Sequence, residues 1–214
     1  MRSTSIIILM LTRSIFYGQS SIEIGSQVWM TENLDVMTFQ NGDPIPQAQS
    51  NEEWEQAGFN QRPAWCYVTV RENNKDKQLV KYKKLYNSFA VNDPRGLVPK
   101  GWRISTTKDW NELRQFLASN NEPLSSILSV SEWEQSTGTN VHGLNIKPGG
   151  WRDVGCGGVG VSVTYWCEQA ENSNVRDKST YTYSLVQYEN GEVGMHEGTT
   201  SWIMGHYVRC VKIQ

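Results

Sequence analysis

The second half of the chain shows no sign of helices. From Thr137 to the C-terminus, apolar side chains do not recur with the 3.6-residue period of a helix. Short runs instead alternate apolar and polar residues, and glycine or asparagine stands between them. The runs are VGVSVTYW, YTYSLVQY and HYVRCVKI. This pattern predicts short strands joined by turns and loops through the whole half.

The helical signals lie in the first half. Thr106 and Asp109 form a capping box, and apolar residues then recur on one face of TTKDWNELRQFLAS, so a helix is expected there. The stretch from Ser50 to Gly58 predicts one or two helical turns, with Ser50 as the cap. PLSSILSV, from Pro123 to Val130, predicts a second, shorter helix with the proline at its first position.

Strands and an exposed loop are predicted between these helices. Ser21 to Leu34 alternates around a turn at Gly25, which is typical of a hairpin. Trp65 to Val70 predicts a strand, and Arg71 to Gln78 is charged enough to be an exposed loop. No long linker, charge block or repeat divides the chain. We therefore expect one domain, residues 21–214, that mixes helices and strands.

Residues 1–20 differ from the rest and predict an export signal. A positive charge is followed by a short apolar run and then by small polar residues, with cleavage expected near Gln19 or Ser20. No later stretch is apolar enough to cross a membrane, so no transmembrane segment is expected. The net charge of −2 and the pI near 6.0 argue against nucleic acid as the main partner.

The stretch KPGGWRDVGCGGVGVSVTYWCEQ, from Lys147 to Gln169, is rich in glycine and almost uncharged. A phosphate-binding loop would need its glycines to lead into a helix, whereas a strand pattern follows Gly160. A metal site has weak support, because the chain has no CxxC pair and its histidines lack zinc-finger spacing. We interpret the stretch as structural framework in which glycines permit tight turns.

Eight motifs follow one another along the chain: IGSQVWMTENL, NGDPIP…EEW, AWCYV, KLYNSFAV, PKGWRISTTKDWNEL, GLNIKPGGWR, TYWCEQ and HYVRCVK. In this order they resemble the Fibrobacter succinogenes major paralogous domain family of exported bacterial proteins. The resemblance covers essentially the whole of residues 21–214 and implies membership of the C-type-lectin-like group. It therefore implies an α+β fold with a twisted antiparallel sheet, about two helices and long loops that carry binding.

The four cysteines are disulfide candidates, since an exported chain meets an oxidising compartment. Three pairings are open. The chain departs from the family at Val98, where a cysteine is usual, and at Cys167, where a serine is usual, so the bridge pattern is left undecided. The candidates are Cys66, Cys156, Cys167 and Cys210.

Catalytic and metal-binding motifs are weak in this sequence. No nucleophile elbow or HExxH motif occurs. The acids Glu132 and Glu134 flank Trp133 but are interpreted as solvated surface. The sugar-binding calcium motif of lectins with the implied fold is also absent. We therefore expect no cofactor, no metal and no catalytic residue.

Recognition by loops is the function that the sequence favours. Tyrosine, tryptophan, asparagine and arginine gather after Trp166, which is the composition of an adaptable binding surface; Tyr181 and Tyr183 also fit an ordinary buried strand. The leading hypothesis is a non-catalytic exported binding module with a protein partner in the cell envelope, such as an outer-membrane complex. The alternatives are a polysaccharide-binding domain, or an enzyme related to sulfatase-modifying factors that uses Cys156 or Cys167. The predicted ligand-binding residues are Asn172, Asn174, Arg176, Tyr181, Tyr183, His196 and Trp202.

Overall fold

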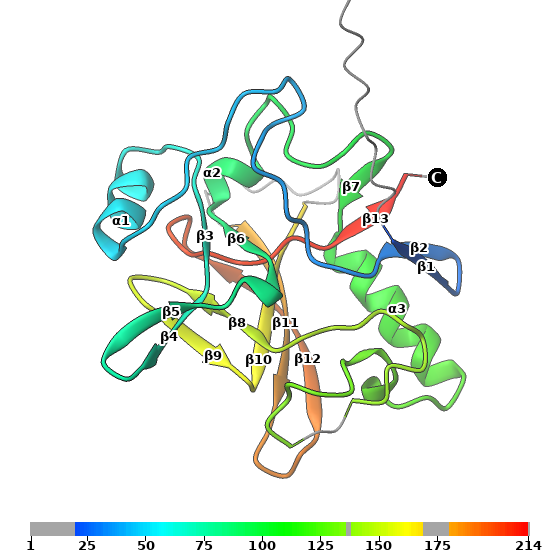
Figure 1. Cartoon of the computed structure of the whole chain (residues 1–214). Coiled ribbons are helices and arrows are strands. Elements are labelled where there is room, and N and C mark those ends of the chain that lie inside the picture. The colour runs from blue at the N-terminus through cyan, green and yellow to red at the C-terminus, as the bar shows by residue number, and fades with distance from the viewer. Residues whose placement is uncertain (1–19, 136–137, 169–179, 214) are drawn as a thin grey trace, which may run out of the picture.

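The computed structural model describes residues 20–135, 138–168 and 180–213, and within them the protein is α+β. Three α-helices accompany mostly antiparallel sheets, and no sheet formed by these residues closes into a barrel (Figure 1). The expected α+β class is thereby confirmed. The helices are α1 (Asn51–Phe59), α2 (Ser88–Val91) and α3 (Thr107–Ser119), and the 3-10 turns are η1 (Val80–Tyr82) and η2 (Leu124–Ile127).

The strands form a four-stranded sheet, a five-stranded sheet and two small antiparallel pairs of strands. The small pairs are β3 with β6 and β4 with β5. The strands are β1 (Ser21–Ile24), β2 (Gln27–Met30), β3 (Trp65–Tyr67), β4 (Thr69–Glu72), β5 (Lys75–Gln78), β6 (Lys84–Tyr86), β7 (Trp102–Ile104), β8 (Gly149–Arg152), β9 (Cys156–Val159), β10 (Ser162–Cys167), β11 (Thr180–Gln187), β12 (Val193–Thr200) and β13 (Cys210–Lys212).

Helix α3 begins at the predicted capping box. The Asp109 amide donates to Thr106 Oγ1 at 3.1 Å, and the Thr106 amide donates to Asp109 Oδ2 at 2.7 Å. Arg103 on β7 also binds the aspartate, because its Nη2 donates to Asp109 Oδ1 at 2.7 Å. Burial alone would raise the pKa of Asp109, but the hydrogen bonds from Arg103 and Thr106 hold it below its ordinary value.

The four-stranded sheet has the order β1-β2-β13-β7, so the last strand of the chain lies between elements from its first half. Arg209, which directly precedes β13, is 1% exposed. Its guanidinium donates to the Met30 carbonyl at 2.9 Å, to the Leu144 carbonyl at 3.2 Å and to Asn33 Oδ1 at 2.8 Å. These bonds fasten the end of the chain to its beginning and to the middle loops.

The five-stranded sheet has the order β12-β11-β10-β8-β9 and is antiparallel except where β8 pairs with β10. Helix α3 packs against β11 (Figure 1). The predicted framework role of the glycine-rich stretch is confirmed, because it forms β8, β9 and β10. Gly150 has φ +74°, and a Cβ there would lie 2.1 Å from the Gly157 carbonyl oxygen, so only glycine fits.

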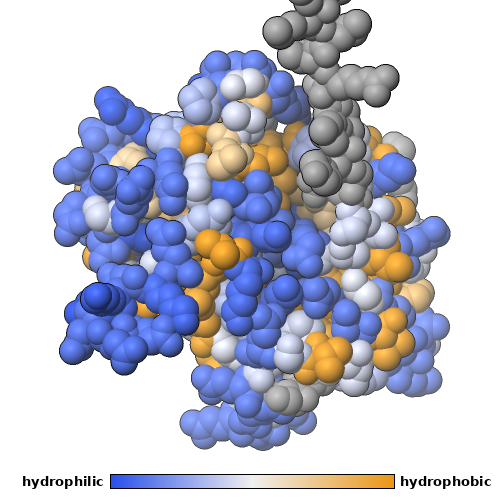
Figure 2. All heavy atoms as spheres, in the orientation of Figure 1, coloured by the Kyte–Doolittle hydropathy of each residue, from blue (hydrophilic) through white to orange (hydrophobic). Residues whose placement is uncertain are grey.

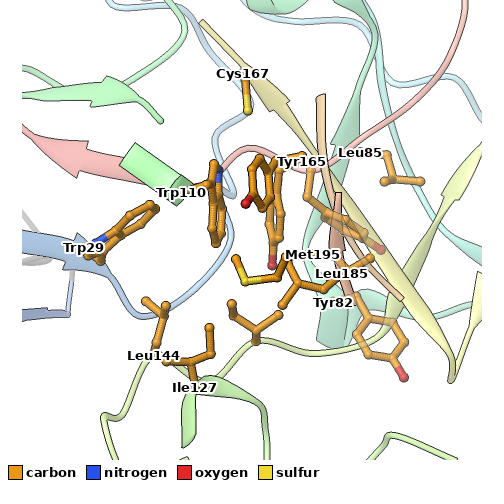
Figure 3. Close-up of a cluster of buried hydrophobic side chains, with 14 of the residues drawn as sticks. Trp29, Tyr82, Leu85, Trp110, Ile127, Leu144, Tyr165, Cys167, Leu185 and Met195 are labelled. Atoms are coloured by element: carbon orange, nitrogen blue, oxygen red, sulfur yellow. The ribbon is translucent and has the colours of Figure 1, made fainter. Parts of the chain in front are cut away.

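The core between α3 and this sheet is built on aromatic rings (Figure 3). Trp110 of α3 stacks on Tyr165 of β10 and Tyr183 of β11, with ring centroids 5.0 and 5.5 Å apart. Trp29 of β2 tilts against the other side of Trp110 at 4.7 Å. All four residues are fully buried, so much of the aromatic content of the chain serves packing.

Two expectations for local structure need correction. Residues 71–78 are not a loop; they form the β4–β5 hairpin, whose turn residues Asn73 and Asn74 have φ values of 50° and 59°. Asparagine tolerates this left-handed conformation, which tight hairpin turns require. Pro123 caps a 3-10 turn, η2, rather than opening an α-helix. The predicted hairpin from Ser21 is confirmed as β1 and β2.

The structure contains no disulfide between the four candidate cysteines. All four cysteines carry free thiols. Val98, at the position where the family resemblance implies a cysteine, packs against the hydrophobic cluster that contains Cys210 and offers no sulfur for a bridge.

Candidate functional site: an aromatic surface beside helix α1

Three aromatic side chains from distant parts of the sequence meet at the surface. Phe59 ends α1, Phe89 belongs to α2, and Trp202 lies in the loop after β12. The Trp202 ring lies edge-on to both phenylalanines, with centroid separations of 6.3 Å to Phe59 and 5.4 Å to Phe89. Phe59 is 70% exposed. We call Phe59, Phe89 and Trp202 the aromatic surface.

Two hydrogen bonds fix the loop that carries Trp202. Ser88 Oγ donates to the Trp202 carbonyl at 2.9 Å, and Trp54 Nε1 donates to the Ile203 carbonyl at 2.9 Å. Gly58 of α1 is buried, and the side chains of Trp202 and Ile203 come within 3.5 Å of where its Cβ would be. The loop is therefore held against both helices, and the aromatic surface is preorganised.

Helix α1 gives the aromatic surface an acidic border. Its sequence, NEEWEQAGF, carries Glu52, Glu53 and Glu55 and no basic residue. Ser50 caps the helix by accepting from the Glu53 amide at 3.1 Å, which places the acids in its first turns. This border favours a partner that surrounds an apolar contact with basic side chains.

A shallow groove also runs along α1, and its lining includes Glu53 of the acidic border. Its volume is about 340 Å³, and most of its lining is formed by small and polar side chains. Arg62 is the one basic residue in this lining and lies just beyond the end of the helix. The lining residues are Pro46, Gln47, Ala48, Glu53, Gln56, Ala57, Asn60, Arg62, Pro63 and Ala64.

The face of the molecule drawn in Figure 2 is mostly hydrophilic. In the view of Figure 2, hydrophilic side chains cover most of the molecule and apolar ones form small separate groups. Scattered apolar residues are normal on a protein surface. The aromatic surface differs because a strongly exposed phenylalanine is joined there by two further rings.

The structure separates the predicted ligand-binding residues. Trp202 belongs to the aromatic surface. His196 is exposed on β12, where its Nε2 lies 2.5 Å from the hydroxyl of Tyr188, near the β11–β12 turn. Tyr181 is half-buried against the core. The remaining predicted residues, Asn172, Asn174 and Arg176, lie outside the described residues.

Tyr183 requires a correction. It was expected on a binding surface, but it is 0% exposed and stacks on Trp110. Its hydroxyl donates to Asn111 Oδ1 at 3.0 Å, and burial raises the pKa of Tyr183 to about 12. Its strand alternates as expected, but the face that bears this side chain lies against α3.

Sequence reasoning missed two members of the aromatic surface. Neither Phe59 nor Phe89 was predicted as a binding residue. One signal was available, because Phe59 is a large apolar residue at the end of an otherwise acidic helix. No local pattern indicates that α2 and the loop after β12 lie next to it.

The candidates for chemistry lie apart from one another. Cys167 is buried next to Trp110, and burial raises the pKa of its thiol. Cys156 is half-buried elsewhere, against Thr69. Glu132 forms an ion pair with Lys81 at 2.7 Å, so it is bound in a surface contact. In the part of the chain that the structure describes, no three His, Cys, Asp or Glu side chains gather as metal ligands.

The fold and this surface define a small α+β domain that presents preorganised aromatic residues to solvent. The sequence model of the Fibrobacter succinogenes major domain matches residues 22–212, so the chain belongs to that family. No curated protein and no solved structure matches the chain. Within the described residues, no helix has the length and apolarity needed to span a membrane.

Proposed function

We propose that the protein is a non-catalytic, exported binding module whose aromatic surface docks a protein partner in the bacterial cell envelope. The partner would be a component of a cell-surface or outer-membrane assembly. The exposed aromatic surface is the observation that carries the proposal. Tryptophan and phenylalanine in a fixed arrangement, with polar side chains around them, match the anatomy of a protein-binding hot spot.

The ring geometry favours a protein over a polysaccharide. Sugar rings stack on flat aromatic faces, and a row of such faces would suit a polysaccharide. Here Trp202 makes interplanar angles of 77° with Phe59 and 65° with Phe89, so the rings form no flat row. An angular apolar cluster suits the side chains of a partner protein better.

The acidic border of α1 favours a partner whose contact surface carries positive charge. Glu52, Glu53 and Glu55 lie on the helix that ends in Phe59. A partner with an apolar centre and lysine or arginine around it would be complementary, and its association rate would fall as salt rises.

We also infer that the fold is of the C-type-lectin-like kind. The support is the family membership, the order of the motifs and the pairing of the last strand with strands from the first half. In that kind of fold, long loops carry recognition. An experimental structure superposed on C-type lectins would test this inference, and a different strand order would contradict it.

Export is part of the proposal and rests on residues 1–20, which have the pattern of a cleaved signal. N-terminal sequencing of the protein from its native cells should find a mature chain that begins near Gln19 or Ser20. An intact Met1 would contradict export by this route.

The decisive experiment is a pull-down of the tagged protein from its own cell envelope in mild detergent, with partners identified by mass spectrometry. The Phe59→Ser variant should lose the partner found with the unchanged protein. The matched control is Val141→Ser, which alters a 76% exposed apolar residue beside η2, away from α1.

The outcomes separate the hypotheses. Loss of one stoichiometric partner with Phe59→Ser, and its retention with Val141→Ser, supports the proposal. Equal retention by both variants contradicts the assignment to the aromatic surface. If no partner appears and a glycan array gives binding that depends on Trp202, the polysaccharide alternative replaces it.

A further inference from the structure

Cys66 and Cys156 meet in one corner of the fold, although they lie far apart in sequence. Cys66 on β3 belongs to the main hydrophobic cluster, and Cys156 on β9 packs against that same cluster. β4, which follows β3, contacts β9 (Figure 1). The Thr69 amide donates to Cys156 Sγ at 3.3 Å, so the thiol of Cys156 touches the chain three residues from Cys66.

Arg152 lies next to both cysteines. It is the direct partner of Cys156 across β8 and β9, so both side chains emerge on the same face of this hairpin. Its guanidinium also lies beside the thiol of Cys66. Arg152 is 3% exposed and donates to Asn51 Oδ1 at 2.7 Å and to the Ser50 carbonyl at 3.2 Å.

The charge of Arg152 has no carboxylate partner in the described ranges. Its hydrogen bonds go to neutral oxygens, and its guanidinium lies 5.2 Å from the centroid of the Trp54 ring. A buried cation without an anion is costly, and a thiolate beside it would offset part of that cost. The arginine is therefore placed to stabilise a thiolate during exchange.

The two cysteines differ in access. Burial raises the pKa of Cys66 to about 12, with Arg152 opposing part of that effect. Cys156 is half-buried, and its sulfur accepts from the amide of Thr69 and from Thr69 Oγ1 at 3.5 Å. Cys167 and Cys210 are buried in other places, Cys167 next to Trp110 and Cys210 next to Arg209.

We propose that Cys66 and Cys156 are a redox pair that forms one disulfide across the β3–β9 corner when a disulfide oxidant is supplied. The Cys156 thiolate attacks one sulfur of the oxidant, breaks its S–S bond, forms a mixed disulfide and releases one thiol. Cys66, deprotonated beside Arg152, then attacks Cys156 Sγ and releases the second thiol. In sum, two protein thiols and one oxidant disulfide give one protein disulfide and two small thiols.

Glutathione disulfide tests this with the whole protein. Of the four thiols, two should remain after oxidation, and a non-reducing digest should contain the Cys66 and Cys156 peptides joined, about 2 Da lighter than their sum. The proposal is overturned if all four thiols remain, or if another pair is joined. It is independent of the partner-binding proposal, because no partner is present in this assay.

Two variants separate the roles of the cysteines. With Cys66→Ser the mixed disulfide on Cys156 cannot resolve, so glutathione should stay attached, adding about 305 Da. With Cys156→Ser, Cys66 should stay unmodified. Cys167→Ser is the matched control and should still form the bridge. Circular dichroism establishes that each variant is folded. A folded Cys66→Ser protein without attached glutathione, or a Cys156→Ser protein glutathionylated at Cys66, would refute the assigned order.

Discussion

His206 makes the stability of the protein depend on pH in a way that can be worked out from its surroundings. Its side chain is 3% exposed, and its ring lies edge-on to Trp166 with centroids 4.5 Å apart. Neither ring nitrogen has a hydrogen-bond partner in the described part of the protein. Burial lowers the pKa of His206 from 6.5 to about 3, because charging an imidazole in this environment is costly.

The direction in which pH changes the stability follows from proton uptake by His206. Below pH 6.5 the unfolded chain binds a proton at this histidine, whereas the folded protein does so only near pH 3. Stability is therefore complete above pH 6.5 and falls as the pH drops towards 3. For these two pKa values, the free energy of unfolding should fall by about 2 kcal/mol between about pH 7.5 and about pH 5.

The test variant is His206→Phe, which keeps an aromatic ring against Trp166 and removes the titrating group. Urea unfolding of both proteins between about pH 7.5 and 5 gives the free energies. Carboxylates titrate in both proteins, so their effect cancels in the difference. The unchanged protein should lose about 2 kcal/mol more than the variant over this range. Curves that stay parallel within about 0.5 kcal/mol would show that His206 does not cause the pH dependence.

Two further predictions concern backbone turns and caps. Gly150→Ala should lower the free energy of unfolding by more than about 2 kcal/mol, because its Cβ would strike the Gly157 carbonyl; Gly143→Ala, also at positive φ but in open space, should cost only about 1 kcal/mol. If both variants lose the same free energy of unfolding in thermal denaturation, backbone strain at positive φ, and not the clash with Gly157, determines the cost. Thr106→Ala should cost about 1 kcal/mol in urea unfolding, because the Asp109 amide loses its cap; an unchanged midpoint would contradict this.

Local signals made part of the fold predictable. The capping box of Thr106 and Asp109 fixes the start of α3 within one residue, because both partners are three positions apart in sequence. The β1–β2 hairpin follows from alternation around Gly25, which has φ +61°. The β4–β5 hairpin was missed, since its polar strands have no apolar period, although Asn73 and Asn74 carried a turn signal.

The candidate site was predictable only in part. The composition after Trp166 pointed to Trp202, but it gave the same weight to Tyr183, which is a core residue. Alternation shows that Tyr181 and Tyr183 share a face, not whether that face meets a helix or water. The position of Phe59 next to Trp202 depends on tertiary contacts between distant segments, which no short-range pattern encodes.

The place of β13 between β2 and β7 has a consequence for how the chain acquires its structure. Until residues 210–212 have been made, β7 has no strand partner in this sheet and β2 is paired with β1 on one side only, and Arg209 binds the Met30 and Leu144 carbonyls only at that point. On the ribosome, the first two hundred residues can form local helices and hairpins, but the four-stranded sheet still lacks the strand between β2 and β7. A chain stopped before Arg209 would leave the facing edges of β2 and β7 unpaired, so this sheet is completed only when residues 209–212 have been made.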